Sequence, residues 1–193
     1  RQSVDSFEDG TVDQFKSAVD ELQNKNMNGL IIDLRGNPGG DLDAVVSMLQ
    51  YMLPKGKIVS IKYKSGKTDE YSCEGDHEFD KPIVILANEN SASASEVFIG
   101  AMRDHNMMTL VGTKTFGKGI VQQYYPFKDG SAVKLTVAKY YTPNGDNIHK
   151  KGFEPDVEVE QPEEETKKIN LPKEEDTQLQ KAIEVMKDKL NNN

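Results

Sequence analysis

Two short, almost wholly apolar segments restrict the fold of this chain more than any other feature of its sequence. They are residues 30–34 (LIIDL) and 83–87 (IVILA), and each is bounded by glycine or polar residues. Apolar runs of this length are typical of buried strands. Each is followed by a turn rich in small residues and then by apolar residues at helical spacing, in segments 42–53 and 94–105. Strands that alternate with helices in this way predict an α/β fold with crossover connections.

The rest of the chain predicts βαβ units extended by an antiparallel section and a C-terminal helix. Pairs of β-patterned segments around short turns predict hairpins. The expected hairpins are residues 58–63 with 68–73 and 120–127 with 132–141, the expected additional strand is 109–111, and a further helix with one apolar face is 12–22. The first residues, 1–9, are expected to be the clipped stub of a core strand.

The composition changes near residue 160 and predicts the domain organisation. We expect a core over residues 1–160, a charged linker over 161–173 and an amphipathic helix over 174–193. The apolar residues of the last segment, spaced four, three and four apart, are Leu179, Ile183, Met186 and Leu190. That spacing places them on one helix face, which we expect to pack against the core.

Composition excludes several classes of function. The chain has 193 residues with a single cysteine and three scattered histidines, which argues against a disulfide framework and against a Cys- or His-based metal site. Its net charge of −8 argues against a nucleic-acid-binding surface. No apolar run is long enough to span a bilayer. We therefore expect no metal site, no nucleic-acid partner and no membrane span.

A run of alternating serines is the first segment that could carry chemistry. Ser91, Ser93 and Ser95 alternate with alanines directly after the apolar run 83–87 and before a predicted helix. A serine at such a turn lies near free N–H groups and the positive end of the helix dipole, where an oxyanion would be stabilised. The ordinary interpretation of one such serine is a helix N-cap. Three serines interleaved with small residues favour a site more strongly than one does.

A lysine between two glycines is the second such segment. Lys118 lies within FGKG (residues 116–119), and a lysine in a polar loop is most often simply solvated. Phosphate binding lacks support because no Ser or Thr follows the Gly-Lys pair as a Walker motif requires. A Ser-His-Asp triad would need His77, His105 or His149, none of which lies in either segment. A Ser-Lys pair is therefore the more economical hypothesis.

Four motifs in order resemble the C-terminal processing peptidases, also called tail-specific proteases. They are GLIIDLRGNPGG (29–40), ANENSASASE (87–96), GTKTFGKGIVQ (112–122), and YTPNG (141–145) with GFEPD (152–156), and the resemblance covers nearly all of residues 7–160. The family has a crotonase-like, Clp-protease-like α/β core and is a family of serine peptidases with a Ser-Lys dyad. The resemblance therefore implies such a core here.

The resemblance also assigns roles to particular residues. It implies that Ser93 is the nucleophile, that Lys118 is the general base and that Gln122 helps to orient the lysine. The backbone N–H groups of Ala94 and Gly40 would form the oxyanion hole, with Gly39 as the alternative to Gly40. An ordinary lysine, with a pKa near 10.4, is charged at neutral pH, so a lysine base needs an apolar pocket that keeps it neutral. Ser91 and Ser95 are expected to cap or pack the helix, and Glu96 is expected in its first turn, where a carboxylate complements the helix dipole.

The function that the resemblance implies is an endopeptidase that cleaves polypeptides near their C-termini through an acyl-enzyme. Such an enzyme would need no metal and no organic cofactor. Substrates would carry apolar C-terminal tails, and the location would be extracytoplasmic, with an anchor outside this sequence. Family members usually carry a peptide-binding PDZ domain ahead of the core, which we expect to be missing here. Two alternatives remain: a catalytically silent peptide- or ligand-binding module of the same fold, and a crotonase-type acyl-thioester enzyme.

Overall fold

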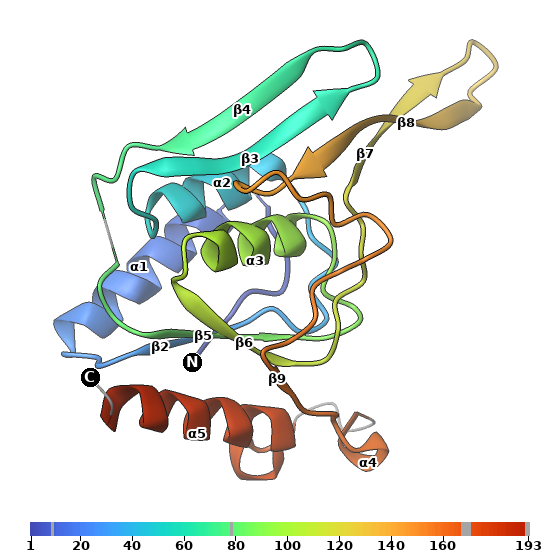
Figure 1. The fold of residues 1–193 in the computed structure, drawn as a ribbon. Coiled ribbons are helices and arrows are strands. Elements are labelled where there is room, and N and C mark those ends of the chain that lie inside the picture. Colours follow the sequence, from blue (N-terminus) through green and yellow to red (C-terminus); the bar gives the residue numbers. More distant parts are fainter. Residues whose placement is uncertain (9, 78, 167–170, 192–193) are drawn as a thin grey trace.

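A five-stranded parallel sheet forms the centre of the molecule (Figure 1). The computed structural model describes residues 1–8, 10–77, 79–166 and 171–191. All neighbouring strands of the sheet are parallel, and their order is β1 (Gln2–Ser3), β2 (Leu30–Asp33), β5 (Ile83–Ala87), β6 (Met108–Gly112) and β9 (Val157–Glu158). The two apolar runs that predicted buried strands are β2 and β5, and they are adjacent. The predicted α/β fold is confirmed.

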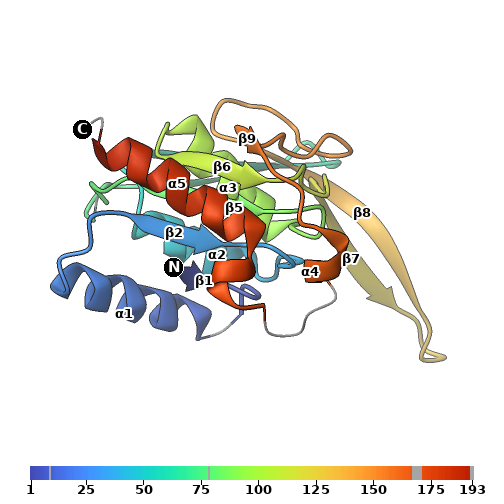
Figure 2. The same cartoon turned by 90° about the horizontal axis from the view of Figure 1, so that it is seen from below.

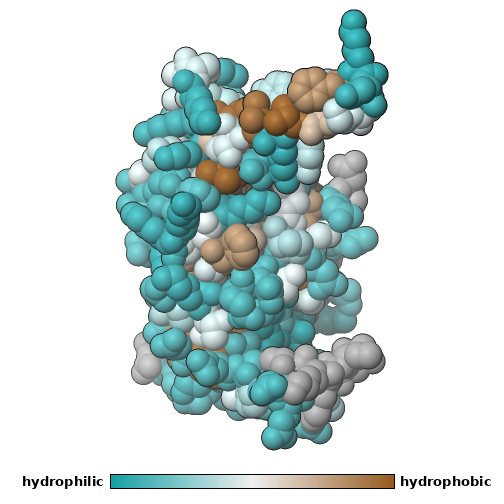
Figure 3. All heavy atoms as spheres, turned by 90° about the vertical axis from the view of Figure 1, so that its right-hand side faces the viewer, coloured by the Kyte–Doolittle hydropathy of each residue, from teal (hydrophilic) through white to brown (hydrophobic). Residues whose placement is uncertain are grey.

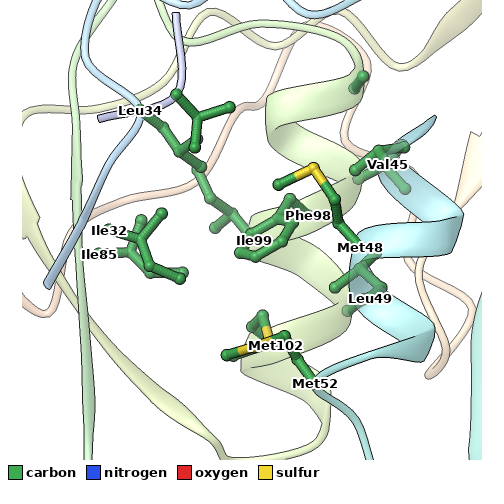
Figure 4. Close-up of a cluster of buried hydrophobic side chains, with 14 of the residues drawn as sticks. Ile32, Leu34, Val45, Met48, Leu49, Met52, Ile85, Phe98, Ile99 and Met102 are labelled. Carbon is green, nitrogen blue, oxygen red and sulfur yellow. The ribbon is translucent and has the colours of Figure 1, made fainter. Parts of the chain in front are cut away.

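Three helices cover one face of this sheet. They are α1 (Thr11–Asn24), α2 (Leu42–Gln50) and α3 (Ala94–Asp104). Alternate residues of the strands point to this face, since the side-chain period of a strand is two. Figure 4 shows Ile32 and Ile85 facing Phe98, Ile99 and side chains from α2, all of them buried. Burial of each such side chain contributes about 1.5–3 kcal/mol, so this layer is the main stabilising core.

The C-terminal helix covers the opposite face (Figure 2). Helix α5 (Thr177–Asn191) packs its buried residues against the other set of alternate strand residues. The two sets are Leu179, Ala182 and Met186 from α5, and Ile31, Val84, Leu86 and Val111 from the sheet. The predicted amphipathic helix therefore packs on the core, except that Leu190, near its end, is exposed. Ahead of it lie the short helix α4 (Glu163–Thr166) and a single 3₁₀ turn, η1 (Lys173–Glu175); part of the predicted linker, residues 167–170, lies outside the described residues.

Both predicted hairpins join one antiparallel sheet beside α2 and α3. Its order is β4 (Thr68–Cys73), β3 (Gly56–Tyr63), β8 (Ala132–Tyr141) and β7 (Ile120–Pro126). The outer part of the β7–β8 hairpin projects from the body (Figure 1). Strand β7 is an edge strand, and the register of β7 on β8 shifts between Val121 and Gln122. No helix in the described ranges is long and apolar enough to cross a membrane.

Candidate active site

Ser93 lies at the turn between the central strand β5 and helix α3. It is the N-cap residue of α3, half-buried, with φ 57° and ψ −113°. A non-glycine residue rarely takes such a positive φ, and at a strained turn the conformation persists only where the surrounding structure holds it. Residues 94–102 of α3 are all buried, which fixes the helix start beneath Ser93. The turn therefore presents Ser93 at the positive end of a rigid helix.

Glu96 is the group that holds this turn. Its side chain is fully buried, and its carboxylate accepts four hydrogen bonds. Oε2 accepts the backbone N–H of Ser93 at 3.1 Å and that of Lys118 at 2.7 Å. Oε1 accepts the hydroxyl of Thr115 and the backbone N–H of Gly117, each at 2.7 Å. A buried carboxylate needs such partners, and here they come from two segments more than twenty residues apart in the chain.

The segment that carries Lys118 is fastened on its other side by residues 148–153. The N–H of Thr115 donates to the carbonyl of Phe153 at 3.1 Å, and the N–H of Phe153 donates to the Thr115 hydroxyl at 2.8 Å. The N–H of Lys150 donates to the carbonyl of Gly117 at 2.8 Å. Lys118 itself is half-buried and has no side-chain hydrogen bond within the described part of the chain. The backbone of the lysine is therefore fixed, while its amine has no partner among the residues that the structure describes.

The predicted site residues are thus brought together to different degrees. One carboxylate oxygen accepts the N–H groups of both Ser93 and Lys118, so their backbones are neighbours. Gln122 lies on the exposed part of β7, and none of the described residues forms a hydrogen bond with its side chain. The assigned roles of Ser93, Lys118 and Gln122 stay predictions.

The glycine loop after β2 lies directly against the serine turn. A Cβ placed on Gly39 would come within 2.8 Å of the Ser93 Cβ and of the Ala94 nitrogen, so only glycine fits there. The N–H of Gly39 donates to Oδ1 of Asn37 at 2.8 Å, and its carbonyl accepts the N–H of Phe7. The N–H groups of Gly40 and Ala94 have no acceptor among the described residues. Those two groups remain available to a ligand.

The neighbouring serines have structural partners. Ser91 and Ser95 are fully buried, and their hydroxyls donate to the carbonyls of Leu34 at 2.8 Å and Asn37 at 3.0 Å. These contacts tie the serine turn to the loop after β2, as expected of packing residues. Of the three serines, Ser93 is the one that is not buried.

Sequence reasoning missed the contributions of Glu96 and Asn37. Ser93 and Glu96 have the spacing of a capping box, which predicts the bond from Glu96 to the N–H of Ser93. Glu96 was expected only to complement the helix dipole, and that interpretation is incomplete because three of its four partners come from the lysine loop. No local pattern signals contacts over such a separation. No group of three or more His, Cys, Asp or Glu side chains in the described ranges could hold a metal ion.

Comparison with known proteins decides the family. Residues 3–159 match the model of peptidase family S41. The chain belongs to peptidase family S41. Over 161 residues it is 41% identical to the carboxy-terminal processing protease CtpA of Bacillus subtilis, covering 83% of this chain and 34% of that protein. It is 40% identical over 169 residues to a carboxyl-terminal-processing protease of Synechocystis sp., covering 88% and 39%.

Solved structures agree with the family assignment. The S41 chain superposes on a photosystem II D1 C-terminal processing protease with a TM-score of 0.76 and 37% identity, covering 82% of this chain and 41% of that one. Mature CPAF, at 15% identity and a TM-score of 0.69 over 97% of this chain and 49% of that one, shares the fold. The chain spans about a third to two fifths of the length of the curated relatives it matches.

Proposed function

We propose that this chain carries the catalytic core of a serine endopeptidase that cleaves polypeptides near their C-termini. The observation that carries the proposal is the strained backbone of Ser93 at the N-terminus of α3, held by the same Glu96 oxygen that holds the backbone of Lys118. Structural strain of this kind concentrates at functional sites. Membership of family S41 and the names of the relatives support the same conclusion.

In the proposed reaction Ser93 attacks the scissile carbonyl carbon. Its hydroxyl proton passes to the neutral amine of Lys118 as the Oγ–C bond forms, and the carbonyl π electrons move onto oxygen. The protonated Lys118 then donates to the leaving amine, and the C–N bond breaks to leave an acyl-enzyme on Ser93. Water deacylates it by the reverse sequence of proton transfers. Gln122, four residues after Lys118, would orient the amine without adding a charge.

The N–H groups of Ala94 and Gly40 are the proposed oxyanion hole. Both lack a protein acceptor among the described residues, and the glycine loop touches the turn of Ser93. Gly39 is the weaker candidate because its N–H is already bonded to Asn37. One such preorganised donor is typically worth about 100- to 1,000-fold in rate.

The exposed apolar side chains of the lysine loop and of the hairpin that follows it support a substrate with an apolar C-terminal tail. Large exposed hydrophobic side chains in the described ranges gather mainly on the lysine loop and the β7–β8 hairpin, namely Phe116, Tyr124, Tyr125, Phe127 and Leu135. Apolar residues show as brown over the upper end of the face in Figure 3. Exposed apolar clusters of this kind are typical of binding surfaces. We also propose that the activity lies outside the cytoplasm, which the family resemblance supports.

The test is cleavage of an unstructured protein such as casein. We expect the wild-type chain to cleave, Ser93→Ala and Lys118→Ala to lose cleavage, and all three to have the same circular dichroism spectrum. Lys114→Ala is the matched control, since Lys114 lies in the same loop but is exposed and paired with Glu154. Cleavage by Ser93→Ala at the wild-type rate would refute the proposal.

The substrate class is tested with two peptides that differ only in their last residues. We expect kcat/KM to be at least about tenfold higher for an apolar tail than for an acidic tail. Equal values would contradict the proposed preference and leave the peptidase activity intact. Tight peptide binding by the wild-type chain without turnover would instead favour the silent binding module.

A further inference from the structure

Asn37 is a fully buried amide, and both ends of its side chain are bonded. Its Nδ2 donates to the carbonyl of Val4 at 2.7 Å, and its Oδ1 accepts the N–H of Gly39 at 2.8 Å. Burial of an amide is costly unless its hydrogen bonds are satisfied. Because one end donates and the other accepts, the two bonds hold the side chain in one orientation.

The backbone of Asn37 bonds to the serine turn on both sides of Ser93. Its carbonyl accepts the N–H of Ala92 at 3.0 Å and the hydroxyl of Ser95 at 3.0 Å. One residue thus connects the N-terminal segment, the glycine loop and the turn before α3. None of these contacts involves the reacting atoms.

The hydrogen bond that Asn37 Oδ1 accepts from Gly39 occupies one of the two backbone N–H groups of the glycine pair and leaves the other free. Gly39 and Gly40 have φ of 105° and 146°, in the region that favours glycine, so their peptide groups could otherwise adopt several orientations. The N–H of Gly39 donates to Oδ1 of Asn37, and the N–H of Phe7 donates to the Gly39 carbonyl at 3.1 Å. The next N–H, that of Gly40, is left without an acceptor among the described residues.

We propose that Asn37 is a positioning residue of the oxyanion hole: by holding the N–H of Gly39 and the turn around Ser93, it directs the N–H of Gly40 toward the developing oxyanion. This inference rests on the proposed peptidase function. An oxyanion donor acts only when it is aimed at the place where the charge develops. Loss of the Asn37 side chain would free the Pro38–Gly39 peptide, whose N–H it accepts, and would so loosen the loop that carries the N–H of Gly40. No group that touches the substrate would be removed.

The kinetic test compares Asn37→Ala with Gln178→Ala. Gln178 is a matched control because it is also a buried amide whose nitrogen donates to a backbone carbonyl, that of Val159 at 2.8 Å, but it lies on α5. We expect Asn37→Ala to lower kcat per folded molecule by about 100-fold with little change in KM. We expect Gln178→Ala to be destabilised and to keep its kcat. If both variants keep kcat, the inference is overturned while the peptidase assignment stands.

A second measurement uses the wild-type chain and needs no variant to fold. When a peptide aldehyde binds, the Oγ of Ser93 attacks the aldehyde carbon. The carbonyl π electrons move onto the aldehyde oxygen, which becomes an oxyanion, and the hydroxyl proton of Ser93 passes to Lys118. In amide NMR spectra we expect the Gly40 resonance to move on aldehyde binding, while the Gly39 amide stays protected from hydrogen exchange. A shift of Gly39 with an unchanged Gly40 would overturn the inference. A wild-type chain that neither cleaves nor binds the aldehyde would overturn the proposed function, and the inference with it.

Discussion

The backbone of Ser93, with φ 57° and ψ −113°, lies in a region that glycine adopts far more readily than serine. Such a conformation costs on the order of 1–3 kcal/mol, and buried α3 and the bond to Glu96 offset that cost. The first prediction follows from this strain. Ser93→Gly should raise the free energy of unfolding in urea by about 1 kcal/mol relative to Ser93→Ala, and both variants should lose all cleavage activity.

Ser93→Ala is the proper reference because it removes the hydroxyl and keeps the Cβ that causes the strain. A glycine variant that is no more stable than the alanine variant would show that the turn is not strained. Restored stability together with lost activity would show that the strain is maintained for function.

At the scale of single residues, the sequence could reveal those with a local pattern. Ser93 was expected at a strand-to-helix turn and Lys118 in a glycine-flanked loop, and the structure has both there. Asn37 could not be recognised, because its partners Val4 and Ser95 are 33 and 58 residues away. Contacts of that range depend on the folded chain and leave no spacing in the sequence.

Between elements, Glu96 connects α3 to the loop that carries Lys118. In Glu96→Gln an NH2 group replaces one of the two carboxylate oxygens. This group is itself a donor, so it cannot accept the N–H and O–H bonds that the oxygen accepted. If it replaces Oε2, the N–H groups of Ser93 and Lys118 both lose their acceptor. Each unsatisfied buried donor costs about 1–3 kcal/mol, so we expect a loss of about 3 kcal/mol in the free energy of unfolding and a large fall in kcat.

Glu154→Gln is the control for this prediction. Glu154 pairs with Lys114 of the same loop, but both side chains are largely exposed, and exposed ion pairs contribute little. Urea unfolding and casein cleavage of the two variants check the expectation. If Glu96→Gln is as stable and as active as Glu154→Gln, Glu96 does not hold the two elements together.

Element type was predictable wherever the apolar pattern was long enough. The runs 30–34 and 83–87 became β2 and β5, and the Asp129-Gly130 turn closed the β7–β8 hairpin. Strand β9, only two residues long, was missed because so short a segment has no period. Strand β9 is set beside β6 by contacts between the two segments. The strands pair in parallel, and the carboxylate of Asp156, just before β9, accepts the N–H of Leu110 in β6 at 2.7 Å.

On the scale of the whole molecule, one arginine joins the sheet to the C-terminal helix. Arg35, just after β2, makes paired hydrogen bonds to Asp33 at 2.7 and 2.9 Å and to Asp176, at the start of α5, with both at 2.8 Å. Asp176 also accepts the N–H of Leu179 at 3.0 Å. The two carboxylates are nearly fully buried, and their charges are compensated by Arg35 together with Arg1, whose guanidinium lies 2.9 Å from Asp33.

The titration of Asp176 makes this connection sensitive to acid. Burial disfavours its charged form, but the hydrogen bonds from Arg35 and Leu179 outweigh burial and hold the pKa of Asp176 below its ordinary value of about 3.9. A carboxylate with a lowered pKa in the folded state contributes stability that is complete above the unfolded value and is lost as the pH falls through the folded value. We therefore expect Asp176→Asn to lower the free energy of unfolding by about 3 kcal/mol near neutral pH.

This loss should shrink as the pH falls below about 3.9, because the unfolded wild-type chain binds the proton first, and it should disappear once the pH lies below the lowered pKa of the folded Asp176 carboxyl. Urea unfolding at a series of pH values measures the difference between wild type and Asp176→Asn. Asp188→Asn, which removes an exposed aspartate from the same helix, should show no such dependence. If the difference in free energy of unfolding between wild type and Asp176→Asn stays constant from neutral to acid pH, the charge of Asp176 does not hold α5 on the sheet. In that case the apolar contacts of Leu179, Ala182 and Met186 alone would hold the helix on the core.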